Sequence, residues 1–293
     1  MLSYFLFSAE KLVSEDTAAH LASADYIYLS CIPLLTGGIR SFGDALRRFG
    51  DLCGKGPRGR RPRILLSTPF ISRGRLFARF CREFASFAPL FDGFLLQNAG
   101  DVELIRTLTA SSFGAAFMGP SGERFILAGD TAFNVTNRVS AEYRSGVLDV
   151  LAILPELSKE DQFSRARAVP VNVIPEITVF SAAIVSRSEH CIAAVKDFHC
   201  GRCGPCGLSA GYLRDERGRR FGIITDPEDC SSLLLGIPQE EAFAKSPFAA
   251  DPAFRRSFFD GNGSPAAPGI PGTIENLPGD LAEKAVFRVY EGI

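Results

Sequence analysis

The feature that most constrains the fold is an alternation of apolar, strand-like runs with helical patterns over the first 190 residues. Residues 26–30 are rich in the β-branched and aromatic side chains that favour strands, and residues 93–98 form a short apolar run that ends in two amides. Residues 75–87 instead carry phenylalanine and leucine at helical spacing. Repeated strand–helix units with short connections predict a parallel sheet covered by helices. Six or seven such units favour an α/β fold of the TIM-like (β/α) barrel type, complete or incomplete, over two small sheets.

The same pattern assigns the remaining elements. The predicted strands cover residues 4–8, 26–30, 63–68, 93–98, 124–128, 147–154 and 172–185, where the last range holds one strand or a pair. The predicted helices cover residues 10–21, 41–52, 75–87, 101–108 and 158–167, and a further helix includes Ser140. Ser41, Asp101 and Ser158 are the expected N-caps of their helices. A strand-like run at residues 285–290 is expected to pair back onto the body of the protein.

Polar side chains gather where the predicted strands end. The chemistry of (β/α) barrels sits at the carboxyl ends of the strands. The alternative is that these amides and carboxylates cap loops. The polar positions at these ends are Cys31, Thr68, Gln97, Asn98, Asn134, Asn137, Glu156 and Arg187.

A cysteine-rich stretch follows the last of these strands. Residues 190–230 hold five of the eight cysteines and two of the three histidines. Cys200, Cys203 and Cys206 lie on a turn rich in glycine and proline, and Cys191 and Cys230 can close the shell. Closely spaced thiolates suit zinc or an iron–sulfur cluster, and the spacing does not decide between the two.

Disulfides, a redox pair and buried core positions are the alternatives to a metal site for these cysteines. A chain of this length does not need disulfides to fold. A redox pair of the thioredoxin type has two cysteines rather than three. Cys53 and Cys81 fit buried core positions. Without an export signal, the expected location is the cytoplasm, where clustered cysteines bind metal more often than they oxidise.

Composition excludes several classes of function. The net charge of −1 gives no overall field that would attract nucleic acid, and we expect no DNA partner. The basic residues 55–63 are expected to form a solvated connector, although they could touch phosphate. No apolar run is long enough to span a membrane. We therefore expect a barrel domain at residues 1–190, a cysteine-rich metal-binding segment at 191–235 and an irregular tail at 236–293.

Several segments, taken in order, resemble peptidase family U32, the collagenase-like peptidases. The matching segments are residues 26–30, 36–40, 96–100, 129–137, 154–158 and 176–180, followed by His190-Cys191, the cysteine turn, Leu213-Arg214-Asp215 and Cys230. The resemblance spans residues 24–235 and implies a barrel-like fold. It also implies oxygen-independent hydroxylation of a quinone precursor or an RNA base, with a 4Fe–4S cluster and a prephenate-like oxygen donor. Zinc remains the alternative metal, and a heterodimer with a second family member is the implied partner.

Residue roles follow from the resemblance and from position. The implied cluster ligands are Cys191, Cys203, Cys206 and Cys230, with Cys200 and Cys31 as rivals. The expected catalytic residues are Asn134, Asn137, Glu156 and Arg187, and the expected binding residues are Arg40, Gln97 and Asn98. Two other hypotheses stay open: a peptidase that uses Cys191 beside His190, and a non-catalytic zinc or iron–sulfur subunit.

Overall fold

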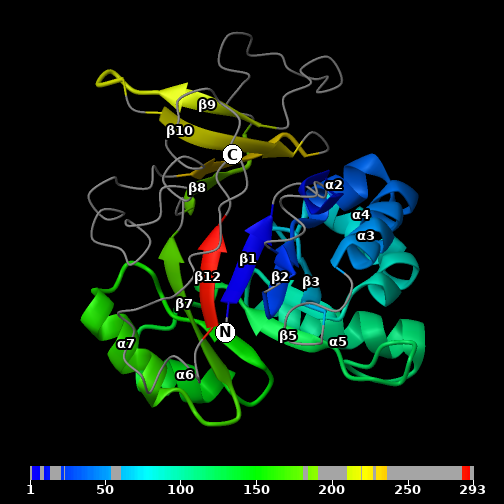
Figure 1. Cartoon of the computed structure of the whole chain (residues 1–293), viewed down its shortest axis with the longest axis horizontal. Coiled ribbons are helices and arrows are strands. Elements are labelled where there is room, and N and C mark those ends of the chain that lie inside the picture. Colours follow the sequence, from blue (N-terminus) through cyan, green and yellow to red (C-terminus); the bar gives the residue numbers. More distant parts are fainter. Residues whose placement is uncertain are drawn as a thin grey trace.

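A closed barrel of eight parallel strands forms the body of the protein (Figure 1). The computed structural model describes residues 2–6, 10–13, 21–22, 24–53, 61–180, 184–190, 210–218, 220–226, 229–235 and 286–290. Within these ranges the TIM-like (β/α) barrel predicted from the sequence is confirmed, and its ring of strands is complete.

The barrel strands follow one another around the ring in chain order, although the four strands of another sheet lie between the last two in the sequence. Each strand pairs in parallel with its two neighbours, and β12 closes the ring between β7 and β1. The strand-like run predicted at residues 285–290 therefore belongs to the barrel, although it lies inside the range expected to be an irregular tail. The barrel strands are β1 Leu2–Leu6, β2 Tyr26–Leu29, β3 Arg63–Ser67, β4 Gly93–Leu96, β5 Ile126–Gly129, β6 Val150–Ala152, β7 Ile174–Phe180 and β12 Val286–Tyr290.

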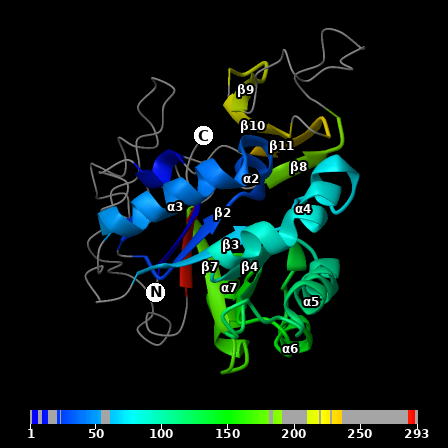
Figure 2. The ribbon, with the colours of Figure 1, turned by 90° about the vertical axis from the view of Figure 1, so that its right-hand side faces the viewer.

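Helices cover the outside of the ring between successive strands (Figure 2). The α-helices are α2 Cys31–Gly37, α3 Ile39–Cys53, α4 Gly74–Phe87, α5 Gly100–Phe113, α6 Arg138–Arg144 and α7 Lys159–Ala168. Short 3-10 turns lie at η1 Glu10–Val13, η2 Ala88–Leu90 and η3 Thr131–Phe133.

The predicted caps are correct at one helix and wrong at two. The Ser158 side chain accepts a hydrogen bond from the Asp161 backbone N–H at the start of α7, as expected. Ser41 lies inside the first turn of α3, where its hydroxyl donates back to carbonyls of the preceding turn. Asp101 is the second residue of α5, because that helix begins at Gly100. Both helices start earlier than predicted, so neither side chain stands at the N-cap position, and neither caps the first N–H groups of its helix.

A layer of aromatic rings joins the helices to the barrel. α4 buries Leu76, Phe80, Phe84 and Phe87 on one face. The Phe84 ring stacks on Phe94 of β4, with 5.4 Å between their centroids. Ring pairs of this kind add to the free energy gained from burying their apolar area. This layer fixes where the loops after β3 and β4 emerge.

The N-terminal end of the barrel repeats one structural device. Asp92 and Asp149 each stand just before a strand and accept a hydrogen bond from the backbone N–H of the preceding strand, at 2.8 Å in both cases. Each carboxylate also pairs with arginine, Arg63 for Asp92 and Arg124 for Asp149. Of the basic stretch at residues 55–63, the described part at 61–63 is thus engaged in structural ion pairs.

A second sheet is inserted between β7 and β12. Its strands are β8 Ile184–Ser188, β9 Ala210–Arg214, β10 Arg220–Asp226 and β11 Ser231–Leu235, in the order β8-β11-β10-β9, and all pairings are antiparallel. In Figure 1 the arrowheads of β1, β7 and β12 point towards this inserted sheet, which lies over the carboxyl ends of the barrel strands. The insertion therefore stands at the end of the barrel where a site is expected.

Candidate functional site at the barrel mouth

Gln97 is the best-defined functional candidate at the barrel mouth, the ring of residues at the carboxyl ends of the barrel strands. It follows β4 directly and is fully buried. Its Oε1 accepts a hydrogen bond of 3.3 Å from the Arg187 guanidinium. Because a guanidinium can only donate, this contact orients the amide so that its NH2 group faces away from Arg187. Within the part of the chain that the structure describes, Nε2 has no hydrogen-bond partner.

An orphaned buried donor of this kind is costly. Leaving such a group unsatisfied costs about 1–3 kcal/mol. Native proteins keep few such groups, and a bound water, an ion or a catalytic role accounts for some of them. The Gln97 amide is thus suited to donate to an acceptor that enters the mouth.

Arg187 reaches the mouth from β8 of the inserted sheet. It is half-buried, and its guanidinium lies 5.4 Å from the centroid of the Phe70 ring. Stacking on an aromatic face holds the planar guanidinium in place and leaves its N–H edges for anions. The two residues lie 90 positions apart in the sequence, and the fold brings them into contact.

Asp101 organises the turn that carries Gln97. It is buried, and its Oδ2 accepts from the backbone N–H groups of Gln97 at 2.9 Å and Asn98 at 3.1 Å. The Thr68 hydroxyl donates to the same oxygen, and the Ser72 hydroxyl donates to Oδ1 at 3.2 Å. Burial raises the pKa of the Asp101 carboxyl, and the hydrogen bond from Thr68 acts in the opposite direction. One carboxylate thereby ties together the loops after β3 and β4.

Asn98 strengthens the same link. Its Nδ2 donates to the Ser72 hydroxyl oxygen at 2.6 Å. Among the predicted binding residues, Gln97 and Asn98 therefore lie in one hydrogen-bonded network, and the predicted catalytic residue Arg187 joins it through Gln97. Cys31 lies at the start of α2 on the same side of the barrel, fully buried, with its backbone N–H 3.4 Å from the Ser67 hydroxyl oxygen.

The remaining predicted residues are not drawn into this network. Asn137 caps α6, because its side chain accepts from the Ser140 backbone N–H. Asn134 is exposed and ends η3 in a left-handed conformation, with φ of 55°. Glu156 and Arg40 are also exposed. For Asn137 the loop-capping alternative describes what the side chain does, and the chemical roles of all four stay predictions.

The cysteine-rich stretch at residues 190–230 begins just after β8 and ends just before β11, and it includes β9 and β10. Four of its predicted ligands, Cys191, Cys200, Cys203 and Cys206, lie outside the described residues. Cys230 is described: its side chain is half-buried, and it stands just before β11 with a left-handed φ of 55°. Within the described ranges, no group of three or more His, Cys, Asp or Glu side chains is placed to hold a metal ion.

Strand pairing brings the two ends of the cysteine-rich stretch towards each other. Ser188 of β8 is the register partner of Ser232 of β11. His190 lies two residues after the first, and Cys230 lies two residues before the second. In an antiparallel pair, these positions face the same end of the ladder. His190 and Cys230, the two described ends of the stretch, therefore stand at the same end of this strand pair.

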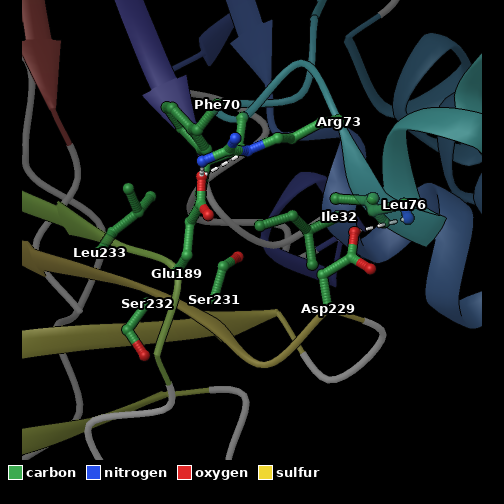
Figure 3. Close-up of a pocket in the computed structure, with 11 residues that line it drawn as sticks. Ile32, Phe70, Arg73, Leu76, Glu189, Asp229, Ser231, Ser232 and Leu233 are labelled. Carbon is green, nitrogen blue, oxygen red and sulfur yellow. Dashed lines mark hydrogen bonds and ion pairs between the residues drawn. The ribbon is translucent and has the colours of Figure 1, made fainter.

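A cavity of about 220 Å³ opens between the barrel rim and the inserted sheet (Figure 3). Ile32, Phe70, Leu76 and Leu233 form its apolar wall. Its polar lining includes Arg73, Glu189, Asp229, Ser231 and Ser232. Arg73 and Glu189 form an ion pair across it, with Nε 2.7 Å from the carboxylate.

Asp229 also lines the cavity, and its carboxylate bonds to the start of α4. It accepts hydrogen bonds from the backbone N–H groups of Arg75 at 2.6 Å and Leu76 at 2.8 Å. Sequence reasoning missed Arg73, Glu189 and Asp229 as site residues. The only signal was the position of the two acids, one just before Cys230 and one two residues before Cys191.

Comparison with known proteins adds little to this geometry. No known family profile matches the sequence, and no curated protein matches it. Among solved structures, the chain is similar to the YdjI aldolase of Escherichia coli K12, with 18% sequence identity and a TM-score of 0.34. The match covers 60% of this chain and 66% of the aldolase, which is less than two thirds of its length.

The sequence also predicted that no segment crosses a membrane. Among the helices in the described ranges, none has the length and apolar character needed to span a bilayer.

Proposed function

We propose that this protein is an iron–sulfur protein of the oxygen-independent hydroxylase type, with its site at the barrel mouth. A 4Fe–4S cluster would be held by thiolates of the cysteine-rich segment. The substrate would be a quinone precursor or an RNA base, and a prephenate-like compound would donate the oxygen. The observation that carries the proposal is the buried Gln97 Nε2 donor, which has no hydrogen-bond partner among the described residues, on an amide whose oxygen accepts from Arg187 of the inserted sheet.

The donor set fits a cluster in its chemistry. Cys230 presents a thiol at the rim of the barrel, on the side where the chain leads into Cys191. We assign Cys191, Cys203, Cys206 and Cys230 as ligands, with Cys200 or Cys31 able to replace one of them; zinc is the alternative metal. When bound, a cluster supplies electron transfer, with a potential that depends on burial and on hydrogen bonds to its sulfurs.

The residues of the mouth would hold the oxygen donor by a carboxylate. A carboxylate accepts hydrogen bonds and cannot donate them. Placed alongside the two side chains, it would accept from the Gln97 Nε2 group and pair with an N–H edge of the Arg187 guanidinium that does not bond to Gln97. Charge-assisted hydrogen bonds of this type are about twice as strong as neutral ones. The Asp101 network would keep the Gln97 backbone fixed while the ligand binds.

The inserted sheet would exclude water from this arrangement. Arg187 comes from the insertion, and Gln97 comes from the barrel, so the carboxylate would be held only when the two parts are docked. Removing bulk water strengthens each electrostatic contact to the ligand. The substrate would then lie between the mouth and the cysteine-rich segment.

Binding of prephenate to anaerobically purified protein tests the carboxylate site. We expect Arg187→Ala to weaken binding by about tenfold to a hundredfold, because a hydrogen bond to a charged group is worth about 1.5–3 kcal/mol. The matched control is Arg214→Ala, which removes an exposed arginine from β9 of the same sheet. Equal affinities for the wild type and the Arg187→Ala variant would remove Arg187 from the site.

No described contact favours the other two hypotheses over this proposal. His190 is exposed at the end of β8, and its backbone N–H donates to the Ser188 hydroxyl at 3.1 Å. A peptidase would need an oriented base beside its nucleophile. The heterodimer, the RNA substrate, the non-catalytic role and the cytoplasmic location stay predictions.

A further inference from the structure

We infer that residues 73–76, here called the α4 platform, position Cys230 and the inserted sheet on the barrel rim through two acidic anchors, Asp229 and Glu189. The inference rests on the proposed function only in taking Cys230 as a cluster ligand. The anchoring itself is independent of any metal.

The first anchor supplies a cap that α4 lacks. The first N–H groups of an α-helix have no partner within the helix. At α4 the residue in the N-cap position is Arg73, whose side chain makes no capping bond. Asp229 provides the cap instead, from 154 positions further along the chain, with bonds of 2.6 and 2.8 Å. Its negative charge also suits the positive end of the helix dipole.

Gly74 makes room for this cap. Its φ of +86° is a conformation that side chains rarely adopt. A Cβ placed on it would lie 2.5 Å from Oδ2 of Asp229, well inside contact distance. Two features thus favour glycine at position 74: the left-handed backbone conformation and the Asp229 carboxylate packed against it.

The second anchor holds the neighbouring strand. Glu189 follows β8 and pairs with Arg73, the residue just before Gly74. β8 and β11 are themselves paired, with Ser188 opposite Ser232. Both strands of the insertion that flank the cysteine-rich stretch at residues 190–230 thus have a neighbouring residue in contact with residues 73–76, at the start of α4.

Each anchor stands next to a predicted ligand. Asp229 immediately precedes Cys230, and Glu189 lies two residues before Cys191. Cys230 itself has a left-handed backbone, which a non-glycine residue keeps only where its surroundings hold it. The Asp229 cap on one side and the β11 ladder on the other provide that support. The thiol of Cys230 is therefore held at the rim before any metal arrives.

The alkylation rate of Cys230 in metal-free, anaerobic full-length protein tests the platform. Iodoacetamide would be the probe, with the modified peptide quantified by mass spectrometry. In both Asp229→Ala and Gly74→Ala we expect Cys230 to react about five to ten times faster, because the segment opens more often once its cap is lost. Cys31 serves as the internal reference for an intact barrel, since it is fully buried.

Two control variants separate capping from general effects. Asp229→Asn keeps an oxygen that can cap the helix, so its rate should stay within about twofold of the wild type. Glu216→Ala removes an exposed acid from the β9–β10 turn of the same sheet and should change nothing. If Cys230 reacts equally fast in the wild type, Asp229→Ala and Gly74→Ala, with Cys31 protected in each, the platform is wrong.

Cluster loading of the same variants distinguishes this failure from failure of the proposed function. A wild type that binds no iron while the alkylation rates differ would overturn the iron–sulfur proposal and leave the platform standing. A wild type and an Asp229→Ala variant that load equal iron and sulfide, and keep their absorbance equally long in air, would overturn the positioning role. We expect the variant to lose at least half of its iron under identical reconstitution.

Discussion

Replacing Asp101 by alanine is the sharpest test of the network beneath the barrel mouth. The carboxylate accepts four hydrogen bonds, two from backbone N–H groups after β4 and two from the hydroxyls of Thr68 and Ser72. The variant removes one acceptor from each of these four donors at a buried position.

The structure sets the size of the loss. The Gln97 N–H keeps a second acceptor, since it lies 2.9 Å from the Thr68 hydroxyl oxygen, and Ser72 keeps its bond from Asn98. The Asn98 N–H loses most, at about 1–3 kcal/mol for an unsatisfied group, because the Thr68 hydroxyl can still donate to the Leu95 carbonyl oxygen at 3.5 Å. Relief of the buried charge offsets part of this. We expect a net loss of about 1–2 kcal/mol in the free energy of unfolding.

The assay is urea denaturation of metal-free protein followed by far-ultraviolet circular dichroism. The matched control is Glu103→Ala, which removes the other acid from the first turn of α5. Glu103 is exposed and pairs with Arg106 on the surface, so its loss should leave the free energy of unfolding close to that of the wild type. Equal stabilities for the two variants would refute the reasoning.

Three further predictions follow from the same structure. Because burial raises the pKa of Asp101, the folded protein binds the carboxyl proton more tightly than the unfolded chain does. The stability of the wild type relative to Asp101→Asn should therefore fall as pH rises from about 3.9, the pKa of an unperturbed aspartate, through the raised pKa. Above the raised pKa this difference in stability should stay level. Denaturation midpoints at successive pH values measure this, and a rise over the same window would contradict it. Gln97→Leu should leave ligand-free stability unchanged or raise it by up to about 1 kcal/mol while abolishing carboxylate binding, because it removes an orphaned donor; a loss above about 2 kcal/mol would show that the amide is structural. Ser158→Ala should lower stability by about 1 kcal/mol through the lost α7 cap, and an unchanged melting temperature would count against that cap.

The barrel could be predicted from the sequence because its signal is local. Strand-like and helical patterns alternate along the chain, and each reports on its own few residues. The final strand could also be anticipated, since residues 285–290 are strand-like by themselves. Its place between β7 and β1 could not, because roughly a hundred residues of insertion separate it from the preceding barrel strand.

The candidate site was predicted in part for the same reason. Gln97 and Asn98 stand directly after an obvious strand, so position alone selected them. Position equally selected Asn137, which the structure uses to cap α6. A strand end attracts amides for capping and for ligand binding, and the sequence pattern is identical in the two cases.

Contacts between distant segments carried no sequence signal. Asp229 and the start of α4 lie 154 residues apart, and no sequence pattern in either segment predicts their contact. Gln97 could be selected as polar but not as unpartnered, since that depends on how Arg187 orients its amide. Such features arise only from packing.

The most direct test of the central claim is the metal content of the protein purified without oxygen. If the protein holds a 4Fe–4S cluster, we expect about four iron and four sulfide per chain with a broad visible absorbance. All three should fall markedly in Cys230→Ser. Preparations that hold neither iron nor zinc, or a Cys230→Ser variant that keeps a full cluster, would contradict the claim.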